Sequence, residues 1–471
     1  MRQWGNRLGR IGLALGIFFL PMVAGPGATG PGRAAAAVGV PATWAHRFGT
    51  TTHDHILTLA RAGNGGLWVG GYVYSPNASS SDAWLARVDA AGAILWQRLY
   101  GGGSSHEVRG IVPLTGGGAL VSAYTTAFGA GGSDALLFKV DANGAVLWQR
   151  TLGDAGLDLI ARILPVGEDF LVVGTKNTGA SNNAVWLFRL SGSGVVTWQK
   201  ALGTSEFGVD LVQATDGSYF LVESSGTSGG FLATVVMKLD ADGNVAWQKA
   251  YVGDNNSIFT PRTLASAPGG GLVVAGYAGT YPSNIYDGWV LRLDSGGAIV
   301  WQKTIGGAGD DQFAAILADG ATYRLAGYTE SSGAGGRDVW ALSLNDSGAI
   351  LWQRTFGDTG SDSANTAIFA DDGGLVIGGT TTSFSAQLTD AWLLKLTGDG
   401  YLGNGCALGV PANLPAANAA AAATLVDKPL SVPTSTPALV SIGTTFGIAA
   451  MTEQCAGPVL QPVLFLGALQ R

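Results

Sequence analysis

One hairpin pattern recurs along the whole chain and limits its possible folds more than any other feature. The first copy reads DAWLARVDAAGAILWQR from Asp82 to Arg98, and related copies begin at Asp134, Ala184, Ala233, Asp287 and Asp338. Each copy has two apolar segments with strand-like alternation, separated by a short cluster of Asp, Asn, Gly or Ser, which is typical of a β-hairpin. The chain is therefore a repeat protein.

The tryptophan of the second hairpin strand marks the period of the repeat. Its seven copies lie 52, 52, 50, 49, 54 and 51 residues apart, at Trp44, Trp96, Trp148, Trp198, Trp247, Trp301 and Trp352. Between the hairpins, each unit adds a Gly-rich loop and two more apolar strands, such as GGLVVAG from Gly270. Four antiparallel strands in about 50 residues are typical of a propeller blade. We therefore predict an all-β fold, a seven-bladed β-propeller.

Other repeat folds fit the sequence less well. The chain has 74 glycines among 471 residues and alternates with a period of two, which excludes helical repeats. A β-solenoid needs shorter coils and parallel strands, whereas these turns indicate antiparallel hairpins. Hydrophobic residues make up 47% of the chain, which provides a large core. The net charge of −7 argues against a nucleic-acid partner, because such proteins need clustered basic residues.

The phase of the repeat predicts how the ring closes. The repeat region spans residues 43–400; it begins with a lone second hairpin strand and ends with a lone first hairpin strand, DAWLLKLTGDG from Asp390. We expect the Trp44 strand to pair with the Trp392 strand as the outermost strand of the last blade. This pairing would remove the open seam between the first and last blades.

The two ends of the sequence differ from the repeats. Residues 1–37 have basic residues, an apolar stretch and then small residues, which predicts a signal peptide and a protein that is secreted or held in the cell envelope. Residues 401–471 form an extension rich in Ala, Pro and Thr, and they hold the only cysteines, Cys406 and Cys455. In an exported chain we expect these two to form a disulfide. The apolar segments are too short for a transmembrane span in the mature chain.

The repeated tryptophans indicate structure rather than a site. A ring of Trp could stack on sugars, but a residue repeated at one strand position fits packing between blades better than it fits a single site. The sequence contains no nucleophile elbow, no phosphate-binding loop and no other recognised catalytic motif. We therefore assign no catalytic residue.

Two metal sites are possible in the loops that follow the repeated tryptophans. Acidic residues there could bind Ca²⁺ or could simply form Asx turns: Asp54, Asp158, Asp310, Asp311, Asp358 and Asp362. All four histidines lie in the first two units, at His46, His53, His55 and His106. Loops at equivalent positions of adjacent blades are neighbours, so a site for Zn²⁺ or a similar metal could form from His53, Asp54, His55, His106 and Glu107. The alternative is that these are ordinary polar loop residues.

The pattern D-x-W-x-x-K/R-x-D-x-x-G-x-x-x-W-Q-K/R, followed by G-G-x-x-V-x-G, resembles that of secreted bacterial β-propeller repeat proteins. The resemblance implies a surface or envelope interaction module. We expect a monomeric, non-enzymatic scaffold that binds a protein or a glycan. The alternative is an envelope hydrolase or lyase with a metal site at one face of the propeller. A quinone-binding propeller is a third, weaker hypothesis.

Overall fold

The computed structural model describes residues 43–403, except 75–79, 102–103, 180–182, 204–205, 227–231, 254–256, 281–282, 284 and 386–387. Farther along the chain it describes the short strands at 409–411, 416–418, 424–427 and 450–453. All of these residues belong to one compact unit, Pro41–Arg471. The predicted signal peptide and both cysteines lie outside the described residues and stay predictions.

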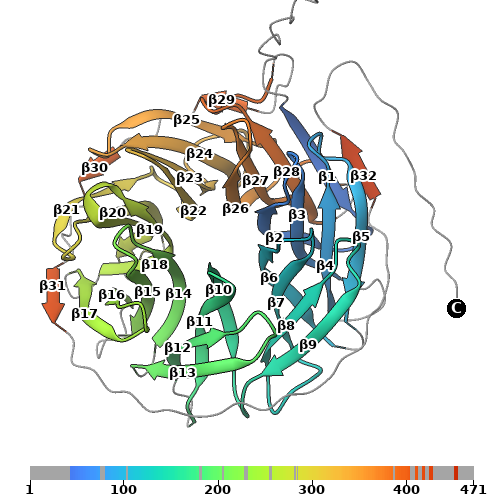
Figure 1. Cartoon of the computed structure of the whole chain (residues 1–471). Helices are drawn as coiled ribbons and strands as arrows, with labels where there is room; N and C mark the ends of the chain where they lie inside the picture. Colours follow the sequence, from blue (N-terminus) through green and yellow to red (C-terminus); the bar gives the residue numbers. More distant parts are fainter. Residues whose placement is uncertain are drawn as a thin grey trace, which may run out of the picture. The chain divides into compact units, whose positions relative to one another are not determined.

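Seven antiparallel sheets surround a common axis (Figure 1), and six of them contain four strands that are consecutive in the sequence. Blade 1 contains β2 (Asp54–Arg61), β3 (Leu67–Tyr74), β4 (Ser81–Val88) and β5 (Ile94–Tyr100). Blade 2 contains β6 (His106–Pro113), β7 (Ala119–Thr125), β8 (Asp134–Val140) and β9 (Val146–Leu152). Blade 3 contains β10 (Leu159–Val166), β11 (Asp169–Asn177), β12 (Asn183–Leu190) and β13 (Val196–Leu202).

The next three blades repeat this order. Blade 4 contains β14 (Glu206–Gln213), β15 (Tyr219–Gly226), β16 (Leu232–Leu239) and β17 (Val245–Val252). Blade 5 contains β18 (Ser257–Ala267), a 3-10 turn η1 (Pro268–Gly270), β19 (Gly271–Thr280), β20 (Tyr286–Leu293) and β21 (Ile299–Ile305). Blade 6 contains β22 (Asp311–Asp319), β23 (Thr322–Thr329), β24 (Asp338–Asn345) and β25 (Ile350–Phe356).

Blade 7 joins the two ends of the repeat region. It contains β26 (Asp362–Phe369), β27 (Leu375–Thr381), β28 (Asp390–Leu396) and β1 (Trp44–Gly49). β1 is antiparallel to β28, and Arg47 lies opposite Trp392. The seven-bladed fold and the closure of its ring by the first strand are therefore confirmed.

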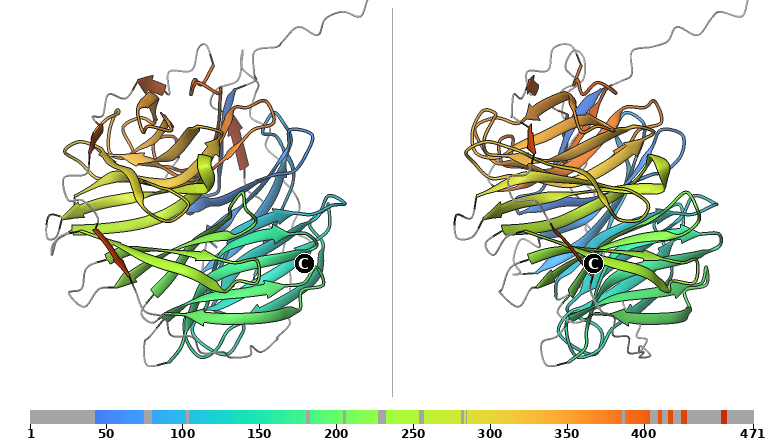
Figure 2. Two further views of the ribbon diagram at one scale, coloured as in Figure 1. Left: turned by 60° about the vertical axis from the view of Figure 1, so that its left-hand side comes forward. Right: turned by 90° about the vertical axis from the view of Figure 1, so that its left-hand side faces the viewer.

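The C-terminal segment adds a fifth strand to four blades, which the sequence did not predict. Its short strands are β29 (Gly409–Pro411), β30 (Ala416–Asn418), β31 (Thr424–Asp427) and β32 (Ala450–Glu453). In this order they pair with the outer strands β25, β21, β17 and β1. Figure 2 shows such strands lying outside the blades. The prediction that β1 is the outermost strand of blade 7 is therefore wrong, because β32 covers its free edge.

Buried tryptophans of the third strand lie at the contacts between blades. Five blades carry one, and each is 2% exposed or less: Trp84, Trp186, Trp289, Trp340 and Trp392. Trp340 of blade 6 shares a buried cluster with Val273 and Val290 of blade 5. In three blades the indole N–H also donates to the glutamine of the adjacent strand, as Trp84 does to Gln97 Oε1 at 3.0 Å. These contacts place the third-strand tryptophans in the packing between blades.

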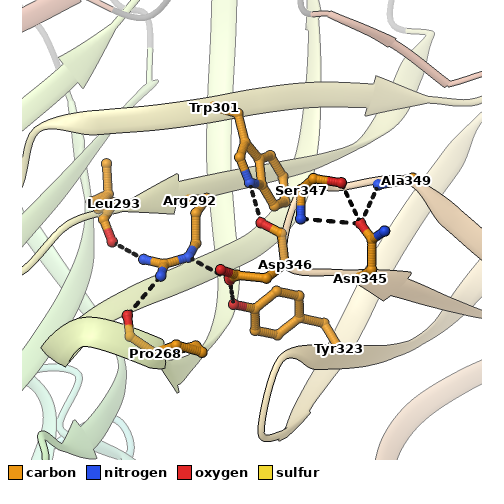
Figure 3. A network of polar contacts seen from close by, with 9 residues as sticks. All are labelled: Pro268, Arg292, Leu293, Trp301, Tyr323, Asn345, Asp346, Ser347 and Ala349. Carbon is orange, nitrogen blue, oxygen red and sulfur yellow. Dashed lines mark hydrogen bonds and ion pairs between the residues drawn. The ribbon is translucent and has the colours of Figure 1, made fainter. Parts of the chain in front are cut away.

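The tryptophan of the fourth strand reaches the hairpin turn of the next blade. Trp301 Nε1 donates to the carbonyl of Asp346 at 2.8 Å, as Figure 3 shows. In the same turn Gly348 has a φ of 74°, and a methyl group there would lie 3.2 Å from the Trp301 ring. The corresponding turn glycines pack in the same way on the preceding tryptophan: Gly92, Gly144, Gly194, Gly243, Gly297 and Gly400. The spacing from Gly to Trp in the repeat thus serves both the turn and the contact between blades.

Figure 3 also shows how polar groups fix this junction. The carboxylate of Asp346 accepts from Arg292 Nε of blade 5 at 3.1 Å and from the hydroxyl of Tyr323. Arg292 Nη2 also donates to the carbonyl of Pro268 at 2.8 Å. The buried guanidinium is therefore satisfied from both blades, which a buried charge requires.

Candidate binding cavity

Every inner strand carries a β-bulge at the same place. The register of the inner strand shifts by one residue in all seven blades, which leaves one residue of each strand outside the ladder. These residues are Leu57, Arg109, Ala161, Val209, Arg262, Ala314 and Asn365. A bulge bends its strand and redirects a side chain, and bulges are common next to functional sites.

All seven bulge residues line one cavity of about 700 Å³ around the axis. Residues that precede the bulges also line it, among them His55, Leu159, Phe207, Gln312 and Ser363. This volume is within the range of roughly 300–1,000 Å³ that is usual for ligand sites. The inner strands therefore form a cavity whose lining differs from blade to blade.

Three arginines at this cavity lie against tyrosine rings. The guanidinium carbon lies 5.6 Å from the ring centre for Arg109 and Tyr124, and 5.4 Å for Arg262 and Tyr277. Arg337 lies 4.3 Å from the ring of Tyr328. Such stacking holds a guanidinium in place while leaving its N–H groups available.

The three arginines differ in their charge partners. Arg109 forms an ion pair with Glu107 at 2.6 Å, and Glu107 also accepts from the Tyr124 hydroxyl at 2.9 Å. Arg337 pairs with Glu330 at 2.8 Å and lies 3.5 Å from a carboxylate oxygen of Asp310. Their positive charge is thus largely compensated within the protein.

Arg262 is the exception among these three. It is exposed at the bulge of β18, and no carboxylate of the described residues forms an ion pair with it. In the neighbouring blade 4, Phe207 lines the same cavity with 43% of its surface exposed. An uncompensated cation and an exposed aromatic face therefore lie in one cavity.

The candidate metal residues fall into separate environments. His106 is fully buried and packs on Phe128, whose ring centre is 5.6 Å away. Asp54 is buried too, and its carboxylate accepts from the Thr50 N–H at 2.6 Å. Burial, acting against the Thr50 hydrogen bonds, raises the pKa of Asp54 to about 7.

Only His55 among them lines the cavity. It stacks on Tyr72 with ring centres 4.5 Å apart, and burial lowers its pKa to about 4, with a smaller effect from His53. The ring of His53 lies 6.4 Å from that of His55. Glu107 is engaged by Arg109 and Tyr124. Among the described residues no three His, Cys, Asp or Glu side chains form a metal-binding group.

The acidic residues proposed for Ca²⁺ mostly close turns. The carboxylate at the start of an inner strand accepts a loop N–H four residues earlier, as Asp158 does from Asp154 at 2.8 Å and Asp311 from Gly307 at 2.9 Å. Asp310 instead accepts from the Tyr328 hydroxyl at 2.5 Å. These contacts correspond to the Asx-turn alternative, and calcium binding stays a prediction.

The carboxylate at the start of an inner strand also lies near a second acid, which comes from the preceding blade. Asp338 of blade 6 faces Asp362 of blade 7, and burial followed by the charge of Asp362 raises the pKa of Asp338 to about 6. Burial and the neighbouring acid likewise raise the pKa of Asp134 beside Asp158 and of Asp287 beside Asp311. Paired buried acids are therefore a recurring feature of the blade junctions.

Comparisons with known proteins identify no family for this chain. A scan against protein-family profiles found no match, and a comparison with curated proteins found none either. Among solved structures, a protein of unknown function from Bacteroides caccae is 16% identical, with 61% of this chain and 92% of that chain covered and a TM-score of 0.36. A puromycin hydrolase is 15% identical, with 70% and 59% covered and a TM-score of 0.38.

A third similar structure is a putative exo-β-1,3-galactanase from Bifidobacterium bifidum. It is 11% identical, covers 58% of this chain and 94% of that chain, and has a TM-score of 0.33. The sheets described above define the class of this chain, a seven-bladed β-propeller with nearly no helix. In the described part of the chain, no helix has the length and apolar character needed to cross a membrane.

Proposed function

We propose that this propeller is a non-enzymatic binding protein of the cell envelope or exterior, and that its cavity binds an acidic glycan. The observation that carries the proposal is Arg262, an exposed cation without a carboxylate partner among the described residues. A guanidinium binds a carboxylate through two parallel N–H groups, which suits the acid group of a uronic acid.

The rest of the lining fits a sugar ring. Phe207 offers an exposed aromatic face, and aromatic faces stack on the C–H surface of sugars. Ser363 offers a hydroxyl group, and Gln312 and Asn365 offer amide oxygens, for hydrogen bonds to sugar hydroxyls. The amide nitrogens of Gln312 and Asn365 donate to Asp310 and to the Ile56 carbonyl. Because these residues come from different blades, the ring must be closed before they form one site.

The experiment is isothermal titration calorimetry with an oligogalacturonate, a neutral cello-oligosaccharide of equal length and poly-glutamate. We expect binding of the oligogalacturonate alone, weakened by Arg262→Ala roughly 10- to 100-fold through the loss of the charge-assisted contact with the carboxylate. Phe207→Ala should weaken it as well.

A matched control is Arg162→Ala. Arg162 lies on β10 beside the bulge but does not line the cavity, and it faces Asp210 at 3.5 Å. Equal losses in the Arg162 and Arg262 variants would contradict the proposed site. Binding of poly-glutamate in place of the glycan would instead support a protein partner.

The second candidate is the envelope hydrolase or lyase with a metal site. Its support is that His55 lines the cavity and that Glu107 lies on the adjacent inner strand. Metal analysis of the purified mature protein, beside His53→Ala and His55→Ala variants, tests it. A stoichiometric transition metal that is lost in either variant would favour this function, whereas Ca²⁺ unchanged by both would belong to the acidic loops.

A further inference from the structure

One carboxylate of blade 4 contacts the inner strands of both neighbouring blades. Asp210 is the residue after the bulge of β14, and it is 7% exposed. Its Oδ2 accepts from the Thr263 hydroxyl and from the Leu264 N–H of blade 5, each at 3.1 Å. Its Oδ1 accepts from the Leu211 N–H at 2.8 Å and lies 3.5 Å from Arg162 Nε of blade 3. Both oxygens are therefore engaged, and one of them contacts blade 5 alone.

The repeat does not supply this carboxylate. The residue after the bulge differs between blades, and only blade 4 has an acid there: Thr58, Gly110, Arg162, Asp210, Thr263, Ala315 and Thr366. The hydrogen bonds from blade 5 to Asp210 thus belong to one junction. A residue that only held the ring together would be needed at every junction.

The two hydrogen bonds to blade 5 hold the chain directly after Arg262. Arg262 is the bulge residue of β18, and Thr263 and Leu264 are the next two residues. A bulge residue has no partner in the ladder, so its direction depends on how the residues on either side of it are held. Pro261 precedes Arg262, and its ring fixes the backbone angle φ on that side. Asp210 holds the other side.

Two tyrosine rings hold the guanidinium itself. The guanidinium carbon of Arg262 lies 5.4 Å from the ring centre of Tyr277, and the ring of Tyr286 packs edge-on to Tyr277 at 5.0 Å. Among the described residues, the cation that pairs with Asp210 is Arg162 and not Arg262. The side chain of Arg262 is thus held without being neutralised, and a group held in place before binding loses less conformational entropy when a ligand arrives.

We propose that Asp210 is a positioning residue, which directs Arg262 to the carboxylate of the same uronic acid unit that stacks on Phe207. Phe207 lies three residues before Asp210 on β14, so Asp210 connects the strand of the aromatic face to the strand of the cation. The spacing between these two groups then selects a sugar that carries a carboxylate over a neutral one. This inference rests on the proposed function, because it takes the acidic glycan as the ligand.

The first test needs no ligand. In the full mature chain, the Nε–Hε NMR signal of Arg262, identified by its loss in Arg262→Ala, reports the motion of the guanidinium. We expect restricted motion in the wild type and the motion of a free side chain in Asp210→Ala. Asp210→Asn should stay close to the wild type, because its amide oxygen still accepts from Thr263 and Leu264.

The matched control for this test is Arg162→Ala. The Arg162 side chain is 56% exposed and faces Oδ1, so its removal leaves both hydrogen bonds from blade 5 to Oδ2 in place. We expect the motion of Arg262 in this variant to equal that in the wild type.

Calorimetry with the oligogalacturonate is the second test. We expect Asp210→Ala to weaken binding about tenfold, and Asp210→Asn to weaken it less than about threefold. In the Arg262→Ala background, Asp210→Ala should change the affinity less than about twofold, because Asp210 acts through Arg262. A residue that only supports the fold would weaken binding equally in both backgrounds.

Two results would overturn the inference. One is a guanidinium of Arg262 that moves as freely in the wild type as in Asp210→Ala. The other is a double variant in which the losses of Asp210→Ala and Arg262→Ala add. A wild-type chain that holds Arg262 but binds no oligogalacturonate would instead contradict the acidic glycan as the ligand, and it would leave Asp210 as the residue that orients this cation.

Discussion

The outer hairpins and the inner strands of this propeller follow opposite rules. In the hairpins the same side chains recur in the same contacts, such as the tryptophan that packs on the turn glycine of the next blade. At the bulges of the inner strands each blade differs, with Arg109 in blade 2, Ala161 in blade 3 and Arg262 in blade 5. Both regions belong to the same repeat unit.

The difference separates the contacts that hold the ring from those that could recognise a ligand. Each hairpin must fit an almost identical neighbour, so one solution serves all seven junctions. The bulge residues line the cavity around the axis, where they need not fit an identical neighbour, although some still make contacts, as the Asn365 amide does by donating to the Ile56 carbonyl at 2.8 Å. Substitutions in the hairpins should therefore change stability, and substitutions at the bulges should change binding.

The largest expected effect is that of Trp340→Ala in a blade junction. Trp340 is fully buried and lies 4.6 Å from the ring of Phe313. Its truncation should cost about 3–5 kcal/mol and lower the midpoint of chemical unfolding. Leu351→Ala, on the exposed side of β25, should change the free energy of unfolding by less than about 0.5 kcal/mol. Similar losses in both variants would break the comparison.

A smaller loss of stability should follow from Gly297→Ala in a hairpin turn. Gly297 has a φ of 78°, and a methyl group there would lie 2.7 Å from the Trp247 ring. We expect a cost of about 2–4 kcal/mol from backbone strain and the clash. Gly217→Ala, at a φ of 82° with no atom within 4 Å of the added methyl group, should lose only about 1 kcal/mol. The difference between the two losses of stability, measured by thermal unfolding, gives the contribution of the contact with Trp247.

The paired acids of the junctions predict a dependence of stability on pH. Burial and Asp362 raise the pKa of Asp338 to about 6, so the folded state binds more protons than the unfolded chain between about pH 4 and pH 6. This contribution is fully present below pH 4 and is lost as the pH rises through 6. Asp338→Asn should reduce the loss of unfolding free energy between pH 5 and pH 7 by about 1 kcal/mol. Chemical unfolding at each pH measures this difference.

The smallest change in stability is expected at the bulges. Ala314→Arg places a second cation on the inner strand next to that of Arg262, where the side chain faces the cavity. The free energy of unfolding should stay within about 0.5 kcal/mol of the wild type, while the affinity for the oligogalacturonate should rise. A large loss of stability at this position would show that the bulges also hold the ring together.

The sequence made the cavity hard to find. The hairpin pattern repeats so closely that it sets the alignment, whereas the inner strands share only apolar character. Aligning the strands that precede GGLWVGG and its copies shows Arg109 and Arg262 in register with Leu57 and Ala161, and this variation was the available signal. Arg337 lies in the loop before β24 and not on an inner strand, so this alignment gives no signal for it.

The sequence alone determined the number of blades, the strands of each hairpin and the pairing of β1 with β28. These follow from alternation, turn chemistry and the period, which are local properties of the chain. Only the tertiary structure decided that His106 is buried while His55 faces the axis, because a shift of one residue reverses the side of a strand. It also decided where β29 to β32 lie, because short strands without a repeat of their own take their register from the edge that they cover.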